Sequence, residues 1–577
     1  MRKYLQYIKP YKLLFILGPL LMLTEVAGEI VLPKLMSQMI DDGILSGRNL
    51  DFIIRQALIM LGCIVIQVSG GIGGHYFSVK AAVCFSADLR KAVFDKVQEF
   101  SFKNIDKFST GSLVTRLTND ITQVMNITRM ALIMAVRSPG MLIGGVIMAF
   151  SINVRLASIM LVMIPLLALA IFLLMKIALP RFDRMQKSLD NLNSKTQENI
   201  TNVRVIKSFV RDRFETERFN EASTDLRDST LAALRVIVCT MPVMTLAMNI
   251  TTLIVLYRGG SLVVGHEMQV GALSAIVQYT TQILSSLMMV SMMIINSTRA
   301  VASLRRISEV LNTEPDLTDE NANAKDKLVT EGRVEFKNVS FKYYENREDK
   351  VIDNVSFTAE PGQIIGIVGV TGSGKSSLVQ LIPRLYDATE GEVLVDGVNV
   401  KDYDLHKLRD GVGMVLQKNV LFSGSIIDNL RWGDEDASEE EIYEASAAAQ
   451  ADGFVRGFTE GYNMELGQGG VNVSGGQKQR LCIARALLKK PKILILDDST
   501  SAVDTATEAK IRHVFATTLK DTTKIIIAQR IGSVLDADKI IVLNDGKIAG
   551  EGTHNELIKS NHEYQEIYYS QMEREVS

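Results

Sequence analysis

Cysteine is scarce in this sequence, and the chain carries almost no net charge. The four cysteines, Cys63, Cys84, Cys239 and Cys482, show no CxxC spacing, so neither a disulfide framework nor a zinc site is predicted. We expect them to be small buried apolar residues. Lys and Arg number 63 against 65 Asp and Glu, a formal net charge of -2. This balance excludes a strongly basic nucleic-acid binder, and no nucleic-acid partner is expected.

The apolar and the charged residues of the sequence are segregated along the chain. At 577 residues it is too long for one compact core, and it is 47% hydrophobic yet 22% charged. The long apolar runs lie before about residue 300, and the charged, glycine-punctuated sequence follows them. The start, Met1-Arg2-Lys3 before an apolar run, resembles a signal peptide, but we interpret it as an uncleaved first span.

Six stretches are apolar enough to cross a bilayer, which takes about 20 residues. They are 13–37, 55–80, 130–150, 155–179, 235–257 and 270–297. The segments 81–129 and 180–234 are polar and helix-forming, and they predict long helices that leave the membrane on one side.

Lys and Arg set the orientation of these spans. Both long segments and the N-terminal flank are rich in these residues, whereas the short loops on the other side carry only Arg48, Arg155 and Arg258 in or near them. We therefore expect a multi-pass protein of the cytoplasmic (inner) membrane, with the long segments and both termini in the cytoplasm. This layout is typical of a transporter, although hydropathy alone also fits a receptor or a sensor.

Two features inside the spans could contact a substrate. Glu25 and Glu29 lie four residues apart on one face of the first span, where ionisable groups are costly. They could contact a cationic substrate or act in gating, but a structural hydrogen bond before Pro33 explains them as well. The sixth span carries Met288, Met289, Met292 and Met293, whose flexible thioethers suit varied apolar ligands but equally suit ordinary helix packing.

A phosphate-binding loop lies in the soluble half, after a polar linker over 312–332. A buried strand over 364–368 leads into a G-x-x-x-x-G-K-S sequence and then into a helix from Ser377, which is the context that confirms the motif. Its residues are Gly369, Val370, Thr371, Gly372, Ser373, Gly374, Lys375 and Ser376. Backbone N–H groups of the loop bind phosphate, Lys375 neutralises the β- and γ-phosphates, and Ser376 ligates Mg²⁺. ATP and Mg²⁺ are the expected cofactors.

Two further motifs belong with this loop. Asp497 ends a hydrophobic strand and is the expected second metal partner. Ser474, Gly475, Gly476 and Gln477 open a helix and form a second anion-binding arrangement. A single phosphate loop has no need of it, but a second nucleotide in a facing domain does.

With these motifs in place, the sequence resembles an ABC exporter half-transporter over essentially its whole length. Ser474–Gln477 resembles the family's LSGGQ signature, Gln417 its Q-loop glutamine that reaches Mg²⁺, Tyr343 the aromatic residue that stacks on adenine, and 501–504 its D-loop. Segments 110–120 and 202–209 resemble its two intracellular loops, whose short helices press on the ATP-binding domains, the second reaching across to the partner's.

The resemblance implies a fold and a domain plan. An all-α six-helix transmembrane domain with long intracellular helices is expected over 1–311, the linker over 312–332, and an α/β P-loop nucleotide-binding domain over 333–577.

The chain departs from the family at the hydrolytic positions. Asp498 stands where the family has the glutamate that polarises water, and a shorter carboxylate can cost on the order of a hundredfold in rate. Gln529 replaces the switch histidine and cannot carry a proton, and Gln468 replaces a glutamate before the signature. The prediction is an ATPase whose own site binds Mg·ATP and hydrolyses it slowly.

An intact signature beside a degenerate site implies a heterodimer with a second, competent half-transporter. Family members with this asymmetry are often multidrug exporters, so the expected substrates are hydrophobic or amphipathic small molecules, moved by alternating access. Three alternatives stay open: a homodimeric exporter with slow hydrolysis, an ATP-binding membrane sensor or regulatory subunit, and an importer on an exporter-like frame.

Overall fold

The computed structural model describes residues 2–46, 50–320, 322–344, 349–498 and 503–576, with the backbone alone for 2, 3, 5, 237, 240, 241, 291, 292, 294–299 and 572–576. The chain divides into two compact units. Unit 1 holds the residues up to 98 together with 110–313, and unit 2 holds 99–109 together with 314–577. The short segment 99–109 thus belongs with the C-terminal half, although both its neighbours in sequence belong to unit 1.

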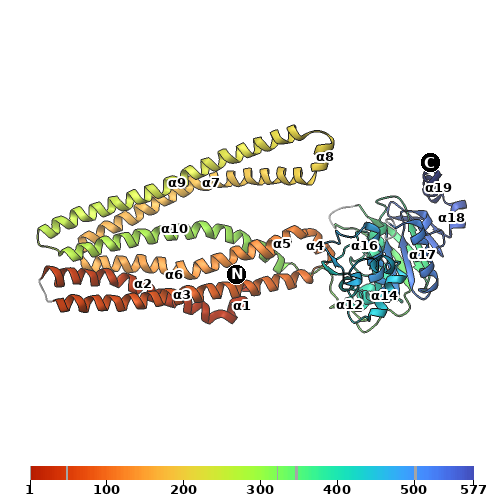
Figure 1. The fold of residues 1–577 in the computed structure, drawn as a ribbon, viewed down its shortest axis with the longest axis horizontal. Helices are drawn as coiled ribbons and strands as arrows, with labels where there is room; N and C mark the ends of the chain where they lie inside the picture. Colours follow the sequence, from red (N-terminus) through yellow and green to blue (C-terminus); the bar gives the residue numbers. More distant parts are fainter. Residues whose placement is uncertain (1, 47–49, 321, 345–348, 499–502, 577) are drawn as a thin grey trace. The chain divides into compact units, whose positions relative to one another are not determined.

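Unit 1 is entirely helical (Figure 1). Its elements are α1 (Arg2–Ile8), η1 (Lys9–Tyr11), α2 (Lys12–Gln38), η2 (Met39–Leu45), α3 (Leu50–Gln98), α5 (Thr110–Thr115), η3 (Arg116–Asp120), α6 (Ile121–Ile152), α7 (Val154–Thr201), α8 (Val203–Ser208), α9 (Asp212–Val264) and α10 (Val270–Asn312).

Six helical stretches among the described residues are long and apolar enough to cross a membrane, and each overlaps one predicted span. The fifth stretch, Pro242–Val264 of α9, overlaps the predicted 235–257. A single residue, Asn153, separates α6 from α7, and its side chain caps α7 by accepting hydrogen bonds from the N–H groups of Arg155 and Leu156.

Close approach between α2 and α3 depends on glycine. A Cβ on Gly70 would lie 3.1 Å from the carbonyl oxygen of Leu21, and one on Gly74 would lie 3.0 Å from the backbone nitrogen of Met22. Small residues at such positions let two helices pack backbone to backbone, as is common in membranes. The polar segments form helical extensions as predicted: α7 and α9 make a long hairpin that α8 closes (Figure 1).

Unit 2 is an α/β structure around sheets. Besides α4 (Phe102–Phe108), its strands are β1 (Val334–Phe341), β2 (Ile352–Ala359), β3 (Ile364–Val368), β4 (Glu390–Val395), β5 (Val398–Asn399), β6 (Val412–Val415), β7 (Gly424–Ser425), β8 (Glu465–Leu466), β9 (Ile493–Asp497), β10 (Thr523–Ile527), β11 (Lys539–Asn544) and β12 (Lys547–Gly552). Its helices are α11 (Lys375–Gln380), α12 (Leu405–Asp410), α13 (Ile426–Leu430), α14 (Glu439–Ala448), α15 (Asp452–Val455), α16 (Gly475–Leu488), α17 (Thr505–Thr517), α18 (His554–Ser560) and α19 (His562–Val576), with η4 (Val400–Asp402), η5 (Gly461–Asn463) and η6 (Ile531–Ser533).

The main sheet has the order β12-β11-β3-β10-β9-β6, parallel except for β12. Every residue of β9 and β10 is buried, as expected of parallel strands covered on both faces. A second, antiparallel sheet has the order β2-β1-β4-β5.

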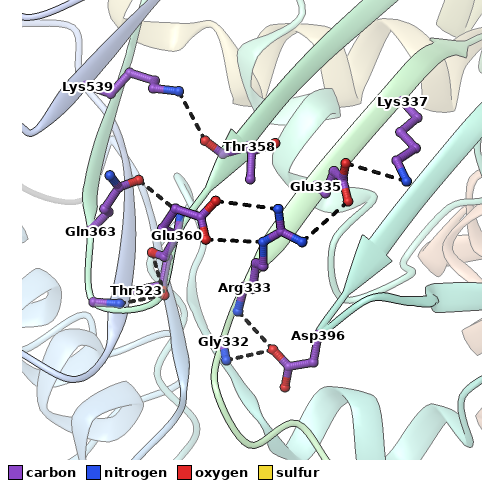
Figure 2. A network of polar contacts seen from close by, with 11 residues as sticks. Gly332, Arg333, Glu335, Lys337, Thr358, Glu360, Gln363, Asp396, Thr523 and Lys539 are labelled. Carbon is purple, nitrogen blue, oxygen red and sulfur yellow. Dashed lines mark hydrogen bonds and ion pairs between the residues drawn. The ribbon is translucent and has the colours of Figure 1, made fainter.

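One carboxylate organises the entry into the second sheet. Asp396 accepts hydrogen bonds from four consecutive backbone N–H groups, those of residues 330–333, at 2.7 to 3.0 Å. Arg333 then pairs with Glu360 and Glu335, which joins β1 to the end of β2 (Figure 2). The end of the predicted linker is therefore a defined turn, whereas the predicted limits 311 and 333 stay predictions.

The cysteine expectation holds for one residue only. Cys482 is buried, Cys63 and Cys84 are half-buried, and Cys239 is exposed. Cys239 lies near the middle of α9, where apolar side chains can face lipid instead of a protein core.

Candidate nucleotide-binding site

Three loops meet at one edge of the main sheet. The strands β3, β10 and β9 are neighbours and parallel, so their carboxyl ends lie side by side. The loop after β3 carries the phosphate-loop motif, Asp497 and Asp498 come at the end of β9, and Gln529 follows β10. Ligands of open α/β sheets bind at this edge, so the sequence-predicted residues are gathered where the fold places a site.

The phosphate loop is held by its own backbone and by Lys375. Gly374 has φ +94°, and a Cβ there would lie 2.6 Å from the carbonyl oxygen of Val351, so glycine is required. The Lys375 ammonium donates to the carbonyl oxygens of Gly369 at 2.9 Å and Val370 at 2.8 Å. Burial lowers the pKa of Lys375, opposed by the charges of Asp497 and Asp498. The loop therefore holds a cation at the start of α11, as anion binding requires.

Two of the three predicted metal ligands are already in contact. The Ser376 hydroxyl donates to the carboxylate of Asp497 at 2.9 Å, and the Asp497 residue is buried. Burial raises the pKa of Asp497, the Ser376 bond lowers it, and Asp498 raises it further. No group of three or more His, Cys, Asp or Glu among the described residues could hold a metal by itself. One carboxylate and one hydroxyl fit Mg²⁺, which binds through few protein ligands together with substrate phosphates.

The two residues at the predicted hydrolytic positions, Asp498 and Gln529, are joined directly. The Gln529 side-chain amide donates to the carboxylate of Asp498 at 2.6 Å. The backbone of Asp498 is fixed from both sides, since its N–H donates to Ile527 and its carbonyl accepts from the Gln479 side chain. An amide holds this carboxylate where the family resemblance places a histidine.

Tyr343 lies beside the start of α11 instead of standing free. Its hydroxyl is 2.8 Å from that of Ser377, and its ring packs edge-on against Phe341 and Tyr386. The neighbouring Tyr344 is the exposed ring of the two. Stacking of Tyr343 on adenine stays a prediction.

The signature residues form the exposed start of α16. Ser474 is its N-cap: its hydroxyl accepts from the N–H of Gln477, and the Gln477 side chain accepts from the N–H of Ser474. Gly475 and Gly476 occupy the first turn, where backbone N–H groups remain available for an anion. None of the described hydrogen bonds joins these four residues to the phosphate loop.

Two predicted residues stand apart from the cluster. Gln417 follows β6 beside β9, so it lies on the same sheet edge, but its exposed side chain makes none of the described hydrogen bonds to Ser376 or Asp497. Of the predicted D-loop, Ser501 and Ala502 lie outside the described residues, and Asp504 caps α17 through the N–H of Thr507.

A connection through Tyr386 was missed by sequence reasoning. Its hydroxyl donates to Asp106 at 2.9 Å, and its ring contacts both Phe102 of α4 and Tyr343. Burial and the contact with Asp106 raise the pKa of Tyr386. Gln479 was missed as well. No motif marks either residue, because their partners lie 280 and 19 positions away.

Comparison with known proteins gives the same domain order. Residues 15–287 match the family model for the ABC transporter transmembrane region, and residues 352–501 match that for the ABC transporter. The ABC transporter ATP-binding protein YfiB of Bacillus subtilis is 42% identical over 577 residues, covering 100% of both chains. The B. subtilis protein YgaD, provisionally named a multidrug export ATP-binding/permease protein, is 32% identical over 98% of each chain.

A solved structure shares the fold. It is that of a bacterial Atm1-family ABC exporter with ATP bound, with a TM-score of 0.79 and 24% identity over 98% of each chain. Six apolar helical stretches among the described residues and the matched ATP-binding sequence occur here in one chain. The chain therefore belongs to the ABC transporter family: it fuses a transmembrane domain to an ABC ATP-binding domain, in the fold of an exporter half-transporter.

Proposed function

We propose that this chain is the slowly hydrolysing subunit of a heterodimeric ABC exporter. The observation that carries the proposal is the Asp498–Gln529 contact. The Asp498 side chain is one methylene shorter than a glutamate. The Gln529 amide, which is uncharged and takes up no proton, donates a hydrogen bond to its carboxylate at 2.6 Å. A base that polarises water must extend to the water and offer it a free carboxylate lone pair. The Asp498 side chain is shorter than a glutamate, and one of its lone pairs accepts from Gln529.

The residues of the sheet edge would bind Mg·ATP without needing these two side chains. Lys375 and the loop N–H groups would hold the phosphates, Ser376, Asp497 and Gln417 the Mg²⁺, and Tyr343 the adenine. ATP, when bound, supplies the binding free energy that closes two such domains on each other. Nucleotide retention and slow turnover are compatible in one site because binding and water activation use different groups.

A second half-transporter completes the proposal. Its phosphate loop would face this chain's Ser474–Gln477, whose exposed helix start is a ready anion site. The lysine and arginine bias supports placement in the cytoplasmic membrane with the ATP-binding domain in the cytoplasm. Hydrophobic or amphipathic drug-like substrates are proposed from the family asymmetry, and the name of YgaD supports this class.

The test is ATPase activity of the purified full chain, alone and with a competent partner. Alone, it should bind ATP but hydrolyse it at a rate near background. The double change Asp498→Glu, Gln529→His should raise the rate on the order of a hundredfold in the paired complex whose partner site has been inactivated.

Vigorous hydrolysis by the unpaired chain, abolished by Asp498→Asn, would establish the homodimeric exporter instead. Efflux of a fluorescent dye from vesicles containing the pair tests transport separately. Normal ATP binding with no ATP-dependent movement of any dye would favour a sensor, and ATP-driven uptake in oriented vesicles an importer.

A further inference from the structure

A charged triad lies inside the helical bundle of unit 1. Glu25 and Glu29 are one turn apart on α2, and Arg137 on α6 pairs with both, at 3.4 Å to Glu25 and 3.3 Å to Glu29. The side chains are mostly buried, with 12% of Glu25, 26% of Glu29 and 28% of Arg137 exposed. All three belong to apolar helices that are long enough to cross a membrane.

The triad is unbalanced in charge. Two carboxylates share one guanidinium, which leaves one negative charge uncompensated at a depth where charge is expensive. It is also unbalanced in hydrogen bonding. The second carboxylate oxygen of Glu25, Oε2, is buried and accepts no hydrogen bond from any described residue. A buried acceptor without a donor is costly, so the site has capacity for one more cation that carries a donor.

The backbone leaves room for this oxygen on the α3 side. Gly71 of α3 faces the Glu25 carboxylate: a Cβ at Gly71 would lie 3.1 Å from its Cδ and 3.2 Å from Oε2. Beside it is a pocket of about 470 Å³, lined by Glu25, Gln67, Val68, Gly71, Ile72 and His75. The lining therefore combines the polar or acidic side chains of Glu25, Gln67 and His75 with the aliphatic ones of Val68 and Ile72.

We propose that this pocket binds an organic amine in its protonated form: the Glu25 carboxylate turns toward the pocket, so that Oε2 accepts from the ammonium N–H, and the apolar group lies against Val68 and Ile72. The ammonium supplies the missing positive charge and the missing donor, while Arg137 keeps its pair with Glu29. This inference rests on the proposed function in naming the amine as cargo of the exporter.

The donor requirement separates the proposal from general attraction of cations. A quaternary ammonium of the same shape carries the charge but no N–H, so it leaves Oε2 unpaired. A neutral alcohol carries the donor but no charge. Only the protonated amine meets both needs.

The experiment measures equilibrium binding to the full chain in phosphatidylcholine nanodiscs, with empty nanodiscs as background. The probes are 4-(1-pyrenyl)butylamine, its trimethylammonium analogue and 4-(1-pyrenyl)butanol. We expect saturable binding of the amine, with the other two probes at least about tenfold weaker. Glu25→Gln should weaken amine binding by about tenfold and leave butanol binding unchanged. Glu267→Gln, which removes a carboxylate paired with Arg155 outside the triad, should change nothing.

A glycine pair gives a second test that keeps the charges. Gly71→Ala pushes on the Glu25 carboxylate and should weaken amine binding, whereas Gly62→Ala on the same helix meets no atom within 4 Å and should not. ATP binding by each variant checks that it is folded. If Glu25→Gln does not fold, the comparison of Gly71→Ala with Gly62→Ala provides the test.

The inference is overturned by any of three results: no saturable amine binding, equal binding of amine and butanol, or full amine affinity in both Glu25→Gln and Gly71→Ala. Because binding is measured without transport, an inactive exporter with normal amine binding would reject the proposed function and keep the site. Active efflux together with unaltered amine binding in these variants would keep the proposed function and reject the amine site.

Discussion

Burial shifts the pKa values of Asp497 and Lys375 in opposite directions, so that they lie closer together than usual. Burial raises the pKa of the Asp497 carboxyl and lowers that of the Lys375 ammonium, because each charged form loses water. Both must be charged to bind Mg·ATP. As pH falls, Asp497 takes up a proton sooner than an ordinary aspartate, and as pH rises, Lys375 loses one sooner than an ordinary lysine.

We therefore expect the affinity for Mg·ATP to fall at both ends of a narrowed pH range. A fluorescent ATP analogue, titrated with and without Mg²⁺ at each pH, measures this. In Asp497→Asn the Mg²⁺-dependent part of the acid limb should disappear while the alkaline limb remains. A wild-type acid limb that matches the titration of ATP alone would contradict the assignment.

The sequence shows which residues stand at positions 498 and 529, but not that their side chains are in contact. The replacement of a glutamate by Asp498 and a histidine by Gln529 can be read from the motifs, since each follows a recognisable strand. Their hydrogen bond cannot, because it depends on β9 and β10 being neighbours. The two substitutions form one structural unit, and we expect their effects on hydrolysis to be non-additive.

At the scale of elements, α4 is joined to the nucleotide-binding half through polar and aromatic contacts. Ser101 caps α4 and also hydrogen-bonds Asp316, and Asp106 accepts from Tyr386. Tyr386 in turn packs on Tyr343, the predicted adenine contact. A change at the nucleotide can therefore reach a segment whose sequence neighbours lie in the membrane unit.

Tyr386→Phe removes only the hydroxyl bond to Asp106 and should loosen α4. We expect amide hydrogen exchange over 99–109 to rise at least about tenfold, in line with the loss of about 1.5 kcal/mol or more from one hydrogen bond to a charged group. Tyr443→Phe, which removes an exposed hydroxyl bond to Glu439, is the matched control. Unchanged exchange in 99–109 would show that Phe102 and Ser101 hold α4 without Tyr386.

Asp396 gives a second prediction at this scale. Asp396→Ala leaves four backbone N–H groups of the turn at 330–333 without their acceptor, and should lower the free energy of unfolding of the nucleotide-binding half by about 2 kcal/mol. The chain has one tryptophan, Trp432, so its fluorescence reports on this half during denaturation. Asp410→Ala, at an exposed carboxylate 3.9 Å from Lys489, should change the midpoint little.

At the scale of the whole molecule, the end of the α7–α9 hairpin exposes apolar side chains. Val205 is 54% exposed, Phe209 74% and Val210 80%. Clustered exposed hydrophobic residues indicate a surface that another protein covers. The family resemblance names this loop as the one that reaches the partner's ATP-binding domain.

Phe209→Ser should therefore leave ATP binding by the isolated chain unchanged and reduce ATPase activity of the paired complex several-fold. Phe94→Ser, another exposed phenylalanine of unit 1, serves as the control. Equal activity of the Phe209→Ser complex and the wild-type complex would remove this loop from the interface.

The sequence by itself determined the features that are local. The six apolar runs are continuous in the chain, and the predicted phosphate loop, signature and two departures each lie in a few consecutive residues. Composition or a short motif is therefore sufficient to predict them. It also marked Glu25 and Glu29, but left their role open between a substrate contact and a structural bond.

Only the tertiary structure decided which residues meet across long separations. Arg137 is 108 positions from Glu29, and Asp106 is 280 from Tyr386, so neither pair has a sequence pattern. Such contacts arise when helices pack at glycines and when parallel strands order themselves in a sheet. Packing, and not propensity, set the charge imbalance at Glu25 and placed an amide on Asp498.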